Sequence, residues 1–278
     1  MWKIGKHEPH ATTCAMAVAH FTYFKGRGHG ERVRYALAAA GIEYTEAFLV
    51  SPGDMDAIRP KCLLSQCPLL EIDGLQLVQS WAIVRYLAAK NGLTPAAPAL
   101  AFRADALAEQ VRDFTVAGEF TGFGWAPGFF EGEEGRAPGQ AKIAAACARY
   151  LPTFEGAVAE GGCLTGEAPC WAGASSRLFY IAALLAAAAR AHPCRAPPPT
   201  RPLAPPAAAA DFQLLYLLNY SVEVLGEGAL AQHAKLAALR SRLNADPRMQ
   251  AHFAQHAQGL VTPEYIAQVK AAQLPKAP

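Results

Sequence analysis

Tyr23 is the first residue in the chain whose surroundings suggest chemistry. It lies in an aromatic, β-prone segment, residues 20–24, and a loop that reads Gly-Arg-Gly-His-Gly follows at residues 26–30. A tyrosine phenol both donates and accepts hydrogen bonds, so it can bind an anion or a backbone group. Ser80 is a second candidate, because it opens a helical segment and a helix N-terminus attracts carboxylates. Each residue also has a plain structural interpretation, as a half-buried strand tyrosine and as an ordinary helix cap.

The seven cysteines supply neither a dithiol redox pair nor a zinc ribbon, because none of them forms a C-x-x-C motif. An odd number of cysteines scattered over 278 residues is typical of reduced thiols in the cytosol. The start of the chain lacks the apolar run of a secretory signal, although a targeting extension in the first 17 residues stays open. The longest apolar run, residues 178–189, is shorter than the roughly 20 residues of a membrane span. We therefore expect a soluble, cytoplasmic protein without a membrane partner.

Composition narrows the classes of partner. Hydrophobic residues make up 52% of the chain and charged residues 17%, which excludes a mostly disordered protein. The formal net charge is +2 and no basic cluster stands out, so we expect no nucleic-acid partner.

The elements that must position the candidate residues alternate in the first third of the chain. Residues 20–24 and 42–50 are predicted strands, and residues 31–40 form a predicted helix between them that Gly41 ends. This βαβ unit predicts two parallel strands. A short helical piece ending at Arg59 follows, and Asp73-Gly74 between two apolar runs predicts a hairpin of residues 68–72 and 75–78. A further helix runs from Ser80, its predicted cap, to about residue 92.

The rest of the chain shows only helical patterns, at residues 100–120, 141–159, 211–225, 230–243 and 247–256. We therefore predict an α/β domain at residues 18–94 and an all-helical domain at residues 99–260. Of the 21 prolines, 7 lie between Pro193 and Pro206. They mark an insertion at about residues 168–208, which we interpret as a disordered surface segment or as a translated unspliced intron.

Four segments resemble the motifs of one family, the cytosolic glutathione S-transferases of the tyrosine type. Residues 22–35 read TYFKGRGHGERVRY, residues 66–74 read QCPLLEIDG and residues 79–87 read QSWAIVRYL. Residues 105–114, DALAEQVRDF, are most similar to the sigma class, which is related to the alpha, mu and pi classes. The resemblance covers about residues 18–166 and 210–257. It implies a thioredoxin-like domain followed by a helical bundle, with glutathione as the co-substrate and no metal.

The resemblance also assigns roles to individual residues. Tyr23 would hold the glutathione sulfur as a thiolate. Cys67 would offer its backbone to the cysteinyl unit of glutathione, in front of a cis proline at position 68. The γ-glutamyl carboxylate would be bound at the helix start. The residues implied as glutathione contacts are Tyr23, Arg59, Gln66, Cys67, Pro68, Gln79, Ser80 and, from the neighbouring subunit of a homodimer, Asp113.

Two positions depart from the family pattern. His29 stands where alpha and sigma relatives often carry an arginine that helps to stabilise the thiolate, next to the retained Arg27. We expect weaker thiol activation, or activation that fades as the pH rises past the histidine pKa. Met55 replaces an aromatic residue of sigma members, so the affinity for glutathione is expected to be reduced.

The implied activity is addition of glutathione to small hydrophobic electrophiles, as in detoxification. The alternatives are a glutathione-dependent isomerase or peroxidase, similar to sigma-type prostaglandin D synthases, and a non-catalytic binding protein that keeps the fold. The aromatic side chains Phe120, Phe123 and Trp125 are candidates for the electrophile pocket, although aromatic residues at helical spacing are more often part of a core.

Overall fold

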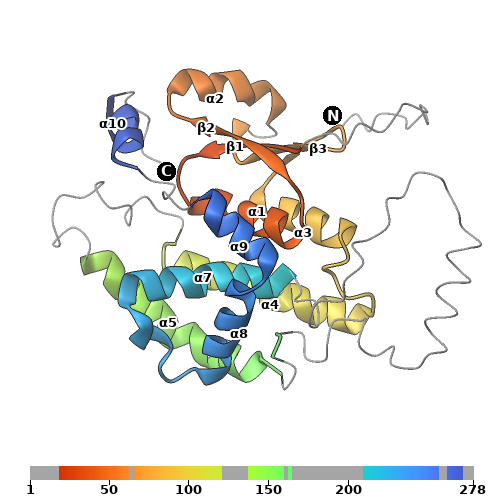
Figure 1. Ribbon diagram of the computed structural model, residues 1–278, viewed down its shortest axis with the longest axis vertical. Helices are drawn as coiled ribbons and strands as arrows, with labels where there is room; N and C mark the ends of the chain where they lie inside the picture. Colours follow the sequence, from red (N-terminus) through yellow and green to blue (C-terminus); the bar gives the residue numbers. More distant parts are fainter. Residues whose placement is uncertain are drawn as a thin grey trace, which may run out of the picture.

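The computed structural model describes residues 19–62, 65–120, 137–159, 162–164, 209–256 and 262–271 (Figure 1). Within these ranges a four-stranded sheet and its helices come first in the chain, and helices make up the remainder. Figure 1 shows the sheet between α2 on one side and the helices α1 and α3 on the other, with the helical region beyond them.

The sheet has the mixed order β2-β1-β3-β4. The strand β1 (Ala19–Phe24) pairs in parallel with β2 (Tyr44–Leu49) and antiparallel with β3 (Leu69–Ile72), which pairs antiparallel with β4 (Leu75–Val78). Asp73 and Gly74, between β3 and β4, have positive φ values of 56° and 73°, as a tight hairpin turn requires. The predicted thioredoxin-like arrangement is confirmed.

Helix α1 (Gly28–Ala39) begins three residues earlier than the sequence predicts and ends where Gly41 indicated. Gly41 has φ 66°, its N–H donates to the carbonyl of Ala38, and the next N–H donates from Ile42 to Leu37. These two bonds are the Schellman motif, in which a glycine in the left-handed region satisfies the last carbonyls of a helix.

Two apolar clusters meet at α1. Val33 and Leu37 belong to the cluster under the sheet, together with residues of α3 (Ser80–Lys90). Tyr35 and Ala39 belong to the larger cluster of the helical region. Because successive residues of one helix bury against both clusters, a shift of α1 would disturb the sheet and the helical region together.

The helical region contains α4 (Pro98–Ala117), α5 (Ala137–Ala157), α7 (Ala209–Leu225), η5 (Glu227–Leu230), α8 (Ala234–Asn244), α9 (Pro247–Gln255) and α10 (Pro263–Ala271). The helix predicted at residues 230–243 is interrupted, since His233, the residue before α8, has an extended φ of −129°. Two short elements, α2 (Pro52–Ile58) and η1 (Arg59–Lys61), follow β2. None of the helices in the described ranges has the length and apolarity that a bilayer crossing requires.

Asp211 joins the two flanks of the proposed insertion. Its carboxylate is fully buried and accepts a hydrogen bond of 2.8 Å from the backbone N–H of Leu164. The chain on either side of residues 165–208 is therefore brought together in space, as expected of a segment inserted between two packed elements. The predicted insertion itself, residues 168–208, lies outside the described residues.

Candidate active site

Tyr23 lies near the carboxyl end of β1, and its side chain is 6% exposed. Its ring packs directly on the first turn of α1, where a Cβ atom added to Gly30 would come within 2.2 Å of the ring carbon Cδ1. The backbone N–H of His29 donates a hydrogen bond of 3.0 Å to the Tyr23 hydroxyl oxygen. Since the oxygen accepts this bond, the hydroxyl proton is left to donate to a ligand.

Burial raises the pKa of Tyr23 to about 12, although the N–H of His29 and the charges of Arg34 and Arg32 pull in the opposite direction. The phenol is therefore protonated across the physiological range. It can act as a hydrogen-bond donor to an anion but not as a base that removes a proton.

The peptide bond between Cys67 and Pro68 is cis, as the resemblance implied, and it lies immediately before β3. Burial raises the pKa of the Cys67 thiol to about 11, so this sulfur is protonated near neutral pH. Cys67 is also close enough to Tyr23 to raise the pKa of the phenol. The structure thus brings the cis-proline turn and Tyr23 together at the same end of the paired strands β1 and β3.

The start of α3 differs from the sequence prediction in one respect. Ser80 was the predicted cap, but it is the first helical residue, and Gln79 occupies the cap position with φ 69° and makes no side-chain capping bond. A non-glycine residue in this region costs of order 1–3 kcal/mol and is found most often at functional sites. The Gln79 side chain donates to the Gln66 amide oxygen at 3.2 Å, which joins two of the predicted glutathione contacts.

Three predicted residues are placed apart from this group. Arg59 forms an exposed ion pair of 2.8 Å with Asp56 one turn earlier. Asp113 is exposed on α4. Arg27 turns towards α7, where it pairs with Glu223 at 2.6 Å and lies 4.9 Å from the centre of the Tyr220 ring. Arg27 therefore ties the loop to the helical region.

His29 is at the protein surface, and its pKa is lowered to about 4 by desolvation and by the nearby charge of Arg32. The imidazole is consequently neutral from about pH 5 upwards, and any loss of thiolate support through its titration falls below the neutral range. With this pKa, the predicted fading of activation would fall below neutral pH, and weaker thiol activation at this position stays a prediction.

The candidate pocket aromatics divide between core and undescribed chain. Phe120 is 1% exposed and packs edge-on against Phe114, with ring centres 5.1 Å apart, so it is part of the core. Phe123 and Trp125 lie outside the described residues. At the same end of the sheet, the Tyr265 hydroxyl of α10 accepts from the N–H of Lys25 at 3.0 Å and donates to the carbonyl of Leu49 at 2.9 Å. This contact places α10 beside the loop that follows Tyr23.

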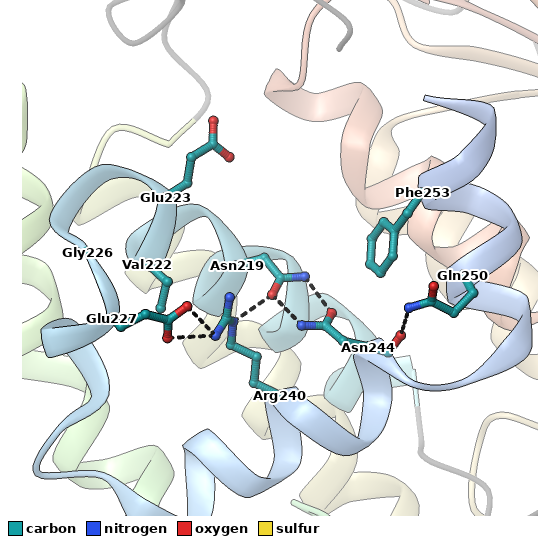
Figure 2. A pocket seen from close by; sticks show the side chains of 9 residues that line it. All are labelled: Asn219, Val222, Glu223, Gly226, Glu227, Arg240, Asn244, Gln250 and Phe253. Carbon is teal, nitrogen blue, oxygen red and sulfur yellow. Dashed lines mark hydrogen bonds and ion pairs between the residues drawn. The ribbon is translucent and has the colours of Figure 1, made fainter. Parts of the chain in front are cut away.

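A hollow of about 640 Å³ opens among α7, α8 and α9 (Figure 2), and Tyr23 is not one of the residues that line it. At its floor Asn219 bonds both Arg240 and Asn244, and Arg240 also pairs with Glu227. Because these polar groups already form hydrogen bonds and an ion pair with one another, we do not propose the hollow as a ligand site.

A buried ion cluster that we did not predict from the sequence lies on α1, behind the site. Arg34 on α1 is fully buried, pairs with Glu31 at 2.9 Å and with Glu46 of β2 at 2.6 Å, and donates to the carbonyls of Gly26 and Phe24. His252 of α9 lies 3.5 Å from Glu31. The i, i+3 spacing of Glu31 and Arg34 could have indicated the first pair, but the contacts to β2 and α9 depend on the fold.

The model of the glutathione S-transferase N-terminal domain matches residues 19–89. The first part of this chain is therefore similar to that domain family. It is 47% identical over 73 residues to glutathione S-transferase A2 of Bos taurus and 45% identical over 73 residues to glutathione S-transferase A3 of Homo sapiens. Each match covers 26% of this chain and 33% of the relative, so the chain aligns with about a third of the length of these curated relatives.

Solved structures extend the likeness to the fold of most of the chain. The glutathione S-transferase of Ascaris lumbricoides has a TM-score of 0.61 at 23% identity and matches 86% of this chain and 97% of that protein. The prostaglandin synthase D of Nilaparvata lugens has a TM-score of 0.57 at 18% identity and covers 86% and 97%. The chain therefore has the glutathione S-transferase fold, a thioredoxin-like domain followed by a helical domain. The alpha-class relatives of its first part are consistent with the tyrosine type.

Proposed function

We propose that the protein is a glutathione transferase that binds glutathione and presents its sulfur as a thiolate to small hydrophobic electrophiles. The observation that carries the proposal is the Tyr23 hydroxyl, which accepts from the His29 N–H and keeps its own proton for a donor bond. The site lies at the end of the central strands β1 and β3, where the turn before β3 would offer backbone groups to an extended peptide. Glutathione is a short peptide that carries its own thiol.

In the proposed reaction the glutathione thiol loses its proton to solvent on binding, and Tyr23 donates a hydrogen bond to the resulting thiolate. The sulfur lone pair then forms a bond to an electrophilic carbon, and a leaving group departs with the electrons of its bond or the electrons move into the acceptor π-system. Tyr23 keeps its proton throughout, which fits a pKa raised to about 12. Its contribution is electrostatic stabilisation by a pre-positioned donor.

The remaining contacts follow from the start of α3. The backbone N–H groups of the first turn and the Ser80 hydroxyl would bind the γ-glutamyl carboxylate, next to the Gln66 and Gln79 amides. Arg59 would have to exchange its exposed pair with Asp56 for the glycine carboxylate, which costs little because such pairs contribute about 0–1 kcal/mol. In a cytoplasmic homodimer, Asp113, which is exposed on α4, would reach across to the γ-glutamyl amine of the glutathione bound to the neighbouring subunit.

The test is retention on immobilised glutathione, followed by conjugation of a chlorinated nitroarene. Tyr23→Phe should lower kcat by about 100-fold, as loss of one transition-state donor does elsewhere, while glutathione retention persists. Tyr86→Phe is the matched control, because its hydroxyl bonds Asp73 at 2.6 Å on the exposed surface. An equal rate in the Tyr23→Phe variant would overturn the assignment of Tyr23.

Two outcomes would indicate the alternatives. Retention without conjugation, but with turnover of an endoperoxide or a hydroperoxide, would identify an isomerase or a peroxidase. Retention without turnover of any substrate in the panel would identify a binding protein.

A further inference from the structure

Arg32 on α1 is a buried cation without a counter-charge. Its side chain is 1% exposed, and its Nε and Nη1 atoms are buried without a hydrogen-bond partner in the described part of the chain. It takes part in none of the ion pairs found among the described residues. Burying a charge in this way costs several kcal/mol when nothing compensates it, so an arginine without partners points to an interaction that is absent from the isolated chain.

The surroundings of Arg32 are aromatic and lie beside the proposed glutathione site. The guanidinium carbon is 4.1 Å from the centre of the Trp81 ring, and Trp81 directly follows Ser80. Arg32 and Tyr23 are close enough for each charged form to shift the pKa of the other, and Tyr216 of α7 acts on Arg32 in the same sense as Tyr23. The cation thus lies against the second residue of α3 and within electrostatic range of the phenol.

Three other basic side chains of the loop and of α1 contribute no net positive charge, whereas Lys25, after β1, lies over the Phe48 ring. Arg34 is paired with Glu31 and Glu46, and Arg27 is paired with Glu223. The imidazole of His29 is neutral at physiological pH. Burial lowers the pKa of Arg32 to about 10, so its guanidinium still carries a full charge there. Of these four side chains, Arg32 alone contributes a net positive potential where the sulfur anion would form.

We propose that Arg32 supports the bound glutathione thiolate electrostatically and takes over the role that His29 cannot perform. This inference rests on the proposed function. Arg32 acts through space, across Tyr23, and does not contact the sulfur. It is therefore a positioning residue, and its effect on the reaction is confined to the fraction of glutathione that is ionised. Glutathione in turn supplies the anion whose field offsets the cost of burying the guanidinium.

The experiment measures the pKa of glutathione bound to the enzyme from the ultraviolet absorbance of the thiolate as a function of pH. Arg32→Met should raise this pKa by about one unit, and the conjugation rate should fall by up to about tenfold, with the full loss at pH values below both the wild-type and the variant pKa. The deficit should disappear above the new pKa, and the KM for glutathione should change little. Arg32→Lys should restore most of the shift, since it returns the charge.

Arg85→Met is the matched control, because it removes one cation from the exposed face of α3, where Arg85 pairs with Asp105 at 2.8 Å. It should leave the thiol pKa unchanged. Thermal unfolding of Arg32→Met should show equal or greater stability than wild type, which separates a lost charge from a damaged fold.

The outcomes distinguish the two proposals. A wild-type protein that binds no glutathione thiolate would overturn the proposed function and this inference with it. A wild-type protein that lowers the thiol pKa, together with an Arg32→Met variant that lowers it equally, would overturn the role of Arg32 alone. An equal shift in Arg85→Met would also overturn it, because the effect would then be one of overall charge.

Discussion

Arg32 and Arg34 lie two residues apart on α1 and are buried to the same degree, yet their surroundings are opposite. Arg34 has two carboxylates and two backbone carbonyls as acceptors, whereas Arg32 has an indole ring and two phenols beside it. A buried cation with a full set of acceptors has a structural role, because its ion pairs and hydrogen bonds already form within the folded chain. A buried cation without acceptors is costly in the isolated chain and has its interaction still to make. The comparison separates a structural face of α1 from a functional one.

The largest effect is expected when the structural face is broken. Arg34→Met leaves Glu31 and Glu46 buried without their partner, and removal of one member of a buried pair typically costs 3–5 kcal/mol. Urea unfolding should therefore show a midpoint well below that of wild type, in contrast with Arg32→Met, which should be neutral or stabilising. Equal urea midpoints for Arg34→Met and Arg32→Met would show that the two arginines contribute to stability in the same way.

The second effect is acid sensitivity of the same face. Arg34, His252 and Arg27 hold the pKa of Glu31 far below its usual range, despite the opposing effect of burial. A depressed folded-state pKa gives stability that is present above the unfolded-state value of about 4.3 and is lost as the pH falls through the folded-state value. Stability should therefore decline below about pH 4 on account of Glu31.

The contribution of Glu31 must be separated from that of other carboxylates, because Asp54, Asp73 and Asp246 also have lowered pKa values. Unfolding free energies measured from pH 7 to pH 3 should fall less steeply for Glu31→Gln than for wild type. Identical slopes would show that Glu31 is not held in its ionised form by the cluster.

The third effect tests the contact between α1 and Tyr23, on which the functional face depends. A methyl group at Gly30 would lie 2.2 Å from the Tyr23 ring, so Gly30→Ala must displace the phenol or the helix. Overpacking of this kind costs about 1–3 kcal/mol and should also reduce the conjugation rate. Gly156→Ala is the control, because nothing lies within 4 Å of a Cβ there and alanine is preferred over glycine in a helix such as α5. A fully active Gly30→Ala enzyme would show that the phenol does not need this position.

Local signals account for what the sequence revealed about the two faces. Tyr23, the cis proline at position 68 and the Asp73-Gly74 turn depend on short segments whose residue types restrict the backbone directly. The predicted boundary of α3 was wrong by one residue, because Gln79 adopts a positive φ, which is not expected of a glutamine. The support of a thiolate by Arg27 stays a prediction, and its ion pair with Glu223 of α7 could not be read from the local sequence.

The partners of the two buried arginines could not be inferred in the same way. Glu46 reaches Arg34 through the pairing of β2 with β1, and Trp81 reaches Arg32 through the packing of α3 on α1. Both contacts arise when elements from distant parts of the chain meet. In the sequence, Arg32 and Arg34 are two similar basic residues of an alanine-rich helix.

The smallest effect is expected at an exposed cation, which fixes the lower limit of the comparison. Arg85 on α3 pairs with Asp105 and Glu109 of α4 while its side chain is 45% exposed. Solvent screens such pairs, and they contribute about 0–1 kcal/mol. Arg85→Met should therefore shift the unfolding midpoint only slightly, and less in high salt, because added ions weaken the wild-type pairs. A loss as large as that of Arg34→Met would mean that these pairs hold the two domains together, and burial would no longer distinguish structural arginines from the rest.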